Sequence, residues 1–201
     1  MKITAALFLV LIFSNSTLAA TCQDRLFKIV EADKEALFTQ TIIKNTIPHR
    51  APFLFVDRVI KLEKVDGAGL TPGDAIEAEW DIHKDLPFYA GHYPGNPVTP
   101  GVLVEESLNQ AATFLALYGM DWGDQVPVLV GSGEKRLINP IVPNTDGSIS
   151  RVNLKVTYKG EENGVHLFEG IARTPDNKFA ARVRGIMGKM VPRSHLKNSS
   201  K

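Results

Sequence analysis

The chain has 201 residues, of which 44% are hydrophobic and 22% are charged, a composition typical of a globular protein with a sizeable core. Its 23 basic and 22 acidic residues leave a formal net charge of +1, without the basic excess that is usual in nucleic-acid-binding proteins. Because Cys22 is the only cysteine, the sequence excludes an intramolecular disulfide and a zinc knuckle.

The first residues have the layout of a secretory signal peptide. Lys2 precedes an apolar run over Ile3–Phe13, and small residues up to Ala19 offer a cleavage site. The apolar run is too short to span a bilayer as a stable helix. We therefore predict a signal peptide over residues 1–19, which indicates export to the periplasm or a plastid route. The alternative is a misassigned start codon in front of a cytoplasmic protein.

A short helical segment is expected next, over residues 20–45. Apolar residues between Asp24 and Asn45 recur at spacings compatible with one or two short helices, and Pro48 ends this pattern. Two strands are then predicted, over Phe53–Leu62 and Ala75–Ile82. The Pro- and Gly-rich residues that follow, up to position 98, indicate irregular structure.

One long helix is predicted from Thr99 to about Gly119. Thr99 can cap it, and Pro100 suits the first helical position because its missing N–H would have no partner there. Apolar residues cover a wide face of this helix, so we expect it to be buried. They are Val102, Leu103, Ala111, Ala112, Leu115 and Ala116.

The remainder of the chain alternates between apolar and polar residues, as strands do. We predict strands over Val126–Ile138, Ser148–Lys159, Val165–Arg173 and Phe179–Lys189. One apolar helix among mostly antiparallel strands predicts an α+β domain over residues 46–193, with the sheet curled around the helix. Residues 194–201 form a polar tail.

The stretch around the start of the helix contains the candidate chemistry. His92 lies in a loop restrained by Pro94 and Pro97, and a side chain held in this way loses little entropy when it acts in catalysis. A lone histidine in a loop is, however, more often an ordinary surface residue. The helix start has unpaired N–H groups, and Gly101 lets a substrate carbonyl approach its backbone closely.

Glu105 and Glu106 are the candidate acids on this helix. Adjacent helical residues point about 100° apart, so the two carboxylates cannot share one face, and periodicity does not decide between them. Both could also be solvated surface groups. A histidine base, a carboxylic acid and a carbonyl-binding helix start suit proton abstraction beside a carbonyl, followed by loss of a β-substituent.

Three segments together resemble the β-hydroxyacyl-acyl-carrier-protein dehydratases of the FabZ type. They are "IPHRAPFLFVDRV" (Ile47–Val59), "GHYPGNPVTPGVLVEE" (Gly91–Glu106) and "INPIVPNTD" (Ile138–Asp146). The resemblance implies the hot-dog fold, in which a curved, mostly antiparallel sheet wraps around one long central helix. It also implies dehydration of (3R)-hydroxyacyl thioesters to trans-2-enoyl thioesters in fatty-acid synthesis.

The resemblance assigns roles to individual residues. It implies that His92 is the general base and Glu106 the general acid, which makes Glu105 a bystander. It implies that Gly101 N–H binds the thioester carbonyl and that the Val98 carbonyl orients the imidazole. Tyr93, which stands where the family usually has phenylalanine, and Val102 complete the expected substrate-binding residues.

The family implies partners but no cofactor and no metal. Its substrates are linked to acyl carrier protein, for which Lys135 and Arg136 are candidate docking residues; they could equally be a solvated strand end. Its active sites lie between the subunits of a homodimer, and dimers often form trimers of dimers. The segment Val128–Leu137 lacks the usual aromatic residue, so acyl-chain gating is expected to differ.

Two other functions remain open at the level of the sequence. One is an exported, non-catalytic hot-dog protein that binds acyl groups or assembles with a partner, which the signal-like N-terminus would suit. The other is a hot-dog thioesterase, which the presence of both His92 and Glu106 disfavours.

Overall fold

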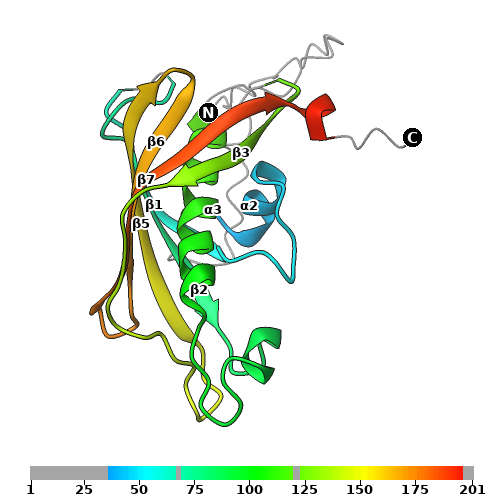
Figure 1. The fold of residues 1–201 in the computed structure, drawn as a ribbon, viewed down its shortest axis with the longest axis vertical. Helices are drawn as coiled ribbons and strands as arrows, with labels where there is room; N and C mark the ends of the chain where they lie inside the picture. The colour runs from blue at the N-terminus through cyan, green and yellow to red at the C-terminus, as the bar shows by residue number, and fades with distance from the viewer. Residues whose placement is uncertain (1–35, 67–68, 120–122, 197–201) are drawn as a thin grey trace, which may run out of the picture.

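A curved antiparallel sheet wraps around one long helix in the computed structural model (Figure 1). The structure describes residues 36–66, 69–119 and 123–196. The predicted signal peptide over residues 1–19 and most of the predicted helical segment lie outside the described residues, so both stay predictions. The hot-dog architecture expected from the sequence is confirmed.

The helices and strands follow in a simple order. The helical elements are α2 (Gln40–Thr46), the 3-10 turn η1 (Pro87–Ala90), α3 (Gly101–Gly119) and the 3-10 turn η2 (Arg193–Leu196). The strands are β1 (Arg58–Glu63), β2 (Ala75–Ile82), β3 (Gln125–Ser132), β4 (Lys135–Leu137), β5 (Ser150–Glu162), β6 (Val165–Arg173) and β7 (Phe179–Pro192). The sheet order is β1-β2-β5-β6-β7-β3, and β4 also pairs with β7. Figure 1 shows the sheet on one side of α3 and α2 on the other.

The core lies between the sheet and α3, and the strand pattern explains why. In β5 the predicted apolar face is buried (Val152, Leu154, Val156 and Tyr158), while Arg151 and Lys155 point outward. Gly170 of β6 lets the helix come close, because an added Cβ would lie 3.1 Å from the Leu108 side chain. Leu108 itself is completely buried on α3. Alternate residues of the strands and the residues on one wide face of the helix are thus buried together in a single core.

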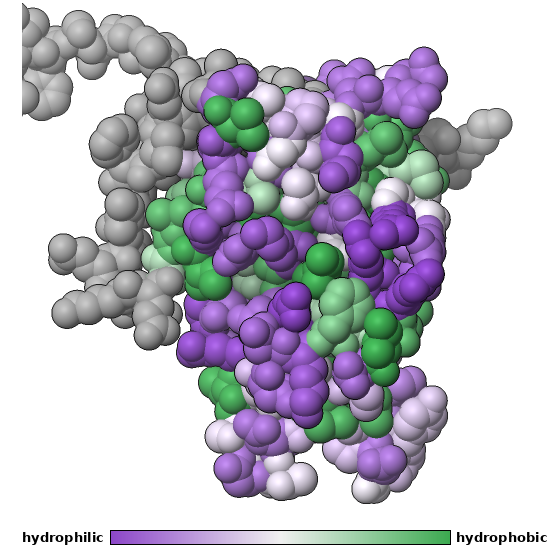
Figure 2. Space-filling view, turned by 90° about the vertical axis from the view of Figure 1, so that its left-hand side faces the viewer, coloured by the Kyte–Doolittle hydropathy of each residue, from purple (hydrophilic) through white to green (hydrophobic). Residues whose placement is uncertain are grey.

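The outer face of the sheet is mainly hydrophilic. Figure 2 views the molecule from the side of the sheet and shows polar side chains over most of this face, with smaller hydrophobic areas between them. Ion pairs run between neighbouring strands here, such as Lys155 with Glu77 at 3.0 Å. Among the described residues, no helix combines the length and the apolar character needed to cross a membrane.

The first predicted strand begins later than expected. We predicted Phe53–Leu62, but β1 begins at Arg58. The backbone of Phe53 and Phe55 is bonded instead to the side chain of Gln110 on α3. A distant amide has therefore taken the backbone groups that a strand would have used.

The predicted strand Val126–Ile138 is divided into β3 and β4. The break occurs at Gly133, whose N–H donates to the carbonyls of Arg184 (3.0 Å) and Gly185 (3.1 Å). A Cβ on Gly133 would lie 2.8 Å from Arg184 O, and Gly185 has φ of +66°. The close approach and the left-handed backbone make this an irregular step in the ladder, which the alternating sequence does not indicate.

The start of the long helix also differs from expectation. The helix begins at Gly101, and the hydroxyl of Thr99, expected to cap it, lies 2.5 Å from the hydroxyl of Tyr89 instead. Val102, assigned to the buried apolar face, is 70% exposed because nothing in the described chain covers that side of the first turn. The rest of the predicted apolar face is covered as expected, apart from the partly buried Leu103.

A stability measurement tests this account of the core. Replacing the fully buried Ile76 of β2 with alanine should lower the free energy of unfolding by about 3 kcal/mol, because it removes buried methyl groups and leaves a cavity. The matched control Ile149→Ala removes the same groups from an exposed position and should cost less than about 0.5 kcal/mol. Chemical denaturation of both variants gives these values, and equal losses would contradict the burial described here.

Candidate functional site

The loop before α3 fixes the position of His92. η1 leads into it, and His92 N–H donates to Phe88 O at 3.0 Å. Val98 N–H donates to His92 O at 3.1 Å, so the loop between these residues closes on itself. Gly95, at φ of +76°, makes the turn that this closure requires. The proline-rich segment therefore gives His92 a defined place at the start of α3.

A hydrogen bond to the backbone determines the tautomer of the His92 imidazole. Its Nδ1 lies 2.8 Å from the backbone oxygen of Val98, and a carbonyl oxygen can only accept a hydrogen bond. In the neutral ring Nδ1 must therefore carry the proton, so that the lone pair of Nε2 is available to accept one. The ring of Tyr93 stacks on that of His92, with centroids 4.3 Å apart. Tyr93 itself is more than half exposed.

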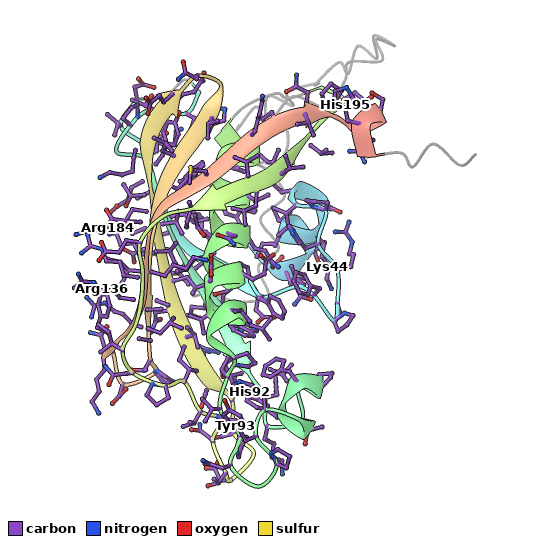
Figure 3. All side chains as sticks on the ribbon, viewed as in Figure 1. Lys44, His92, Tyr93, Arg136, Arg184 and His195 are labelled. Carbon is purple, nitrogen blue, oxygen red and sulfur yellow. The ribbon has the colours of Figure 1, made fainter. Side chains whose placement is uncertain are left out.

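His92 opens into a cavity of about 310 Å³. The cavity also contains Tyr93, Val98 and Gly101, so four of the predicted site residues come together there. The remaining walls are mostly apolar (Thr99, Val104, Leu137–Ile141, Ala180 and Ala181). Figure 3 shows His92 and Tyr93 near the N-terminal end of α3. The cavity therefore combines a free imidazole nitrogen with the positive end of a helix.

Leu137 of β4 packs directly on Gly101, and an added Cβ at Gly101 would overlap its Cδ1. Any other residue at this first position of α3 would push the exposed end of the Leu137 side chain aside. Since Gly101 N–H belongs to the first turn, it has no intrahelical acceptor. A group bound to Gly101 N–H would therefore lie against the Leu137 side chain.

Glu106 does not line the His92 cavity of the described chain. Its carboxylate lies on another side of α3, where Gln110 Nε2 donates to Oε1 at 2.9 Å and Asn109 Nδ2 lies 3.4 Å from Oε2. His49 Nε2 is 3.6 Å from Oε1. Val102 is also absent from the cavity walls. One chain therefore does not bring together all six predicted site residues.

Glu105 faces in a different direction from Glu106. Its Oε1 accepts a hydrogen bond from Ser132 Oγ at 2.9 Å and pairs with Lys135 Nζ at 2.7 Å. Its side chain is 14% exposed and that of Glu106 is 20% exposed, so neither is a freely solvated carboxylate. Glu105 fastens α3 to the β3–β4 edge of the sheet.

Two polar residues that the sequence pattern did not indicate lie beside Glu106. Gln110, one helical turn after Glu106, is completely buried, and His49 is half-buried beside the same carboxylate. Burial lowers the pKa of His49, and the neighbouring Arg50 lowers it further, against the opposing charge of Glu106. The available signal for Gln110 was its place four residues after Glu106, on the same face of α3.

The expected basic rim is only partly free. Lys135 is paired with Glu105, and Arg136 with Glu134 at 2.7 Å. Arg136, Arg182 and Arg184 line a second cavity of about 220 Å³ that shares Ile138 with the His92 cavity. Figure 3 shows Arg136 and Arg184 projecting outward from the sheet. Within the described residues, no group of three or more His, Cys, Asp or Glu side chains could hold a metal ion.

Comparison with known sequences identifies one family. The FabA-like domain matches residues 47–182. The chain is 33% identical over 130 residues to the 3-hydroxyacyl-[acyl-carrier-protein] dehydratase FabZ of Symbiobacterium thermophilum, covering 65% of this chain and 82% of that protein. It is 34% identical over 150 residues to the FabZ of Dechloromonas aromatica, covering 73% and 94%.

Solved structures agree on the fold. A chain of the dehydratase heterocomplex ApeI:P from Xenorhabdus doucetiae aligns with a TM-score of 0.57 at 15% identity, covering 77% of this chain and 93% of that chain. A hot-dog-like protein from Thermanaerovibrio acidaminovorans aligns with a TM-score of 0.51 at 15% identity, covering 63% and 87%. At these identities the likeness concerns the fold alone.

The tautomer of His92 can be measured directly. Nitrogen NMR of the imidazole at neutral pH should show the proton on Nδ1, because Val98 O accepts from it. The exposed His195 serves as the control and should show exchange between tautomers. A proton found on Nε2 of His92 would contradict the assignment, since that nitrogen would then be unable to accept a proton.

Proposed function

This chain belongs to the FabA-like family of FabZ-type dehydratases, and we propose that it removes water from (3R)-hydroxyacyl thioesters carried by an acyl carrier protein. One observation carries the proposal: His92, whose Nε2 can accept a proton, and Gly101 at the start of α3 line the same largely apolar cavity. The apolar walls suit an acyl chain. Nε2 of His92 suits the α-carbon of the thioester, and Gly101 N–H suits its carbonyl oxygen. The reaction would serve fatty-acid synthesis.

Three groups of the protein take part in the proposed reaction. His92 Nε2 takes a proton from the α-carbon, while Gly101 N–H stabilises the negative charge that develops on the thioester oxygen. Glu106 gives its proton to the β-hydroxyl, the C–O bond breaks, and water leaves. The product is the trans-2-enoyl thioester. Imidazolium and carboxylate then return to their starting protonation states by exchange with solvent, so no redox partner is required.

We further propose that Glu106 acts in the cavity of a second copy. In its own chain Glu106 lies outside the His92 cavity, so a complete site needs a carboxylate from elsewhere. The edge strand β3 carries Leu129 and Val130, both 51% exposed, and pairing two such edges about a two-fold axis would cover them. A homodimer that places each Glu106 beside the partner's cavity meets both requirements.

The carrier protein would approach over the arginine-lined cavity on the outer face. Arg136, with a side chain 69% exposed, lies beside Ile138, which also lines the His92 cavity. Positive charge at this place would attract an acidic carrier and its phosphate-bearing arm. Both candidates pair with a glutamate at 2.7 Å, Lys135 with Glu105 and Arg136 with Glu134, but the Lys135 side chain is less exposed, at 45% against 69%. Arg136 is therefore the better of the two docking candidates from the sequence.

The direct test is an assay of the purified protein with a 3-hydroxyacyl thioester. We expect the enoyl product, and His92→Ala and Glu106→Gln should each lower turnover at least about 100-fold while the fold stays intact. Glu105→Gln is the matched control and should stay within about threefold, since Glu105 does not line the His92 cavity and the glutamine oxygen can still accept from Ser132 Oγ and Lys135 Nζ. Release of free thiol would indicate a thioesterase, and neither product would indicate an acyl-binding protein.

Mixing two inactive variants tests the shared site. A heterodimer of His92→Ala and Glu106→Gln subunits contains one site with both an intact histidine and an intact glutamate. After unfolding and refolding together, the mixture should recover about a quarter of wild-type turnover, by random pairing of subunits. The separately refolded variants are the control. A monomer by light scattering that still turns over substrate would contradict the shared site.

A further inference from the structure

His49 occupies a place next to Glu106 that the proposed reaction has not yet used. It lies in the loop between α2 and the segment Phe53–Phe55, and its Nε2 is 3.6 Å from Glu106 Oε1. The two side chains are 26% and 20% exposed, so both are largely shielded from solvent. A separation just beyond hydrogen-bond range closes with a small side-chain rotation, as hydrogen bonds at active sites often do when substrate binds.

Gln110 determines which oxygen of Glu106 is held. Phe55 N–H can only donate, so the atom that it meets at 2.8 Å must be the oxygen of the Gln110 amide. The amide NH₂ therefore faces Phe53 O at 3.1 Å and Glu106 Oε1 at 2.9 Å, and it donates to both. Oε1 thus has a firm donor, whereas within the described part of the chain Oε2 has only Asn109 Nδ2, at 3.4 Å.

The surroundings of His49 also fix its tautomer. Its Nδ1 is buried and has no hydrogen-bond partner among the described residues. A buried N–H without an acceptor is rarer and costlier than an unused lone pair, so the proton belongs on Nε2, toward Glu106. Burial, the largest cause, and the Arg50 charge lower the pKa of His49, which keeps the ring neutral at neutral pH. Arg50 is bonded to the carbonyls of Ile47 and His49.

We infer that His49 is a positioning residue for Glu106: its Nε2–H and the Gln110 amide together hold Oε1, so that Oε2 carries the proton to the substrate. This inference rests on the proposed dehydration. A neutral donor suits the task because it orients the carboxyl group without fixing it as an anion. A lysine or arginine in the same place would stabilise the ionised form and oppose proton delivery.

Two substitutions separate positioning from packing. His49→Leu keeps the bulk and removes the donor, so kcat should fall about tenfold while KM stays within about twofold. His49→Gln places a neutral N–H donor at similar reach and should restore most of kcat. The melting temperature of both should stay within about 2 °C of wild type. His195→Leu on η2 is the control and should leave kcat unchanged.

The interaction with Glu106 is tested in the double variant. If His49 acts through this carboxyl group, adding His49→Leu to Glu106→Gln should lower kcat no further. Independent, multiplying losses would overturn the inference. Unchanged kcat in His49→Leu would overturn it as well, and so would a His49→Gln variant as impaired as His49→Leu.

NMR gives a readout that does not depend on turnover. At neutral pH the His49 ring should carry its proton on Nε2, and Glu106→Gln should lower the pKa of His49 further, because the opposing carboxylate charge is removed. An Nδ1 proton, or a titration that Glu106→Gln leaves unchanged, would overturn the inference. If the wild-type protein makes no enoyl product, the proposed function fails, and these spectra alone decide whether His49 holds Glu106.

Discussion

The buried side chain of Gln110 is the interaction on which the arrangement of the site depends. From the middle of α3 it accepts a hydrogen bond from Phe55 N–H and donates to Phe53 O and Glu106. These bonds attach the loop before β1 to the helix and orient the carboxylate one turn away. Because a buried amide must satisfy both of its ends, the fold and the carboxylate geometry are determined together. Leucine at this position would leave backbone groups of the loop without partners.

A second constraint acts at the other end of the site, where backbone and side chains approach closely. A Cβ on Gly101 would displace the flexible end of the exposed Leu137 side chain, and Leu137 lies on β4, which the break at Gly133 separates from β3. The ion pair between Lys135 and Glu105 fastens β4 to α3. The irregular step in the sheet, the ion pair and the glycine therefore act together to shape the wall of the His92 cavity. A regular strand over the same residues would have placed a different side chain against the helix.

Local patterns predicted what local physics determines. Alternation in β5 and the apolar residues of α3 identified most of the core, because burial there follows the period of a strand or a helix. The start of β1 was missed because its competitor, Gln110, lies 55 residues away from Phe55 in the chain. The break at Gly133 depends on carbonyls of β7, which is distant in the sequence. Val102 is exposed because no other described element packs over it, which the helix pattern does not indicate. For the site, spacing found the His92 loop, but the residue roles came from the family resemblance.

The two adjacent glutamates show why periodicity alone could not assign the acid. Both are glutamates and both are partly buried, so neither hydropathy nor burial distinguishes them, and only their partners differ. Glu105 pairs with the ammonium group of Lys135, a partner that suits a structural tie between α3 and β4. Glu106 accepts hydrogen bonds from the amides of Asn109 and Gln110, and Nε2 of His49, whose pKa is lowered by burial, lies 3.6 Å from its Oε1. We propose Glu106 as the acid, and the amides that hold it carry no charge, unlike the Lys135 ammonium group that holds Glu105.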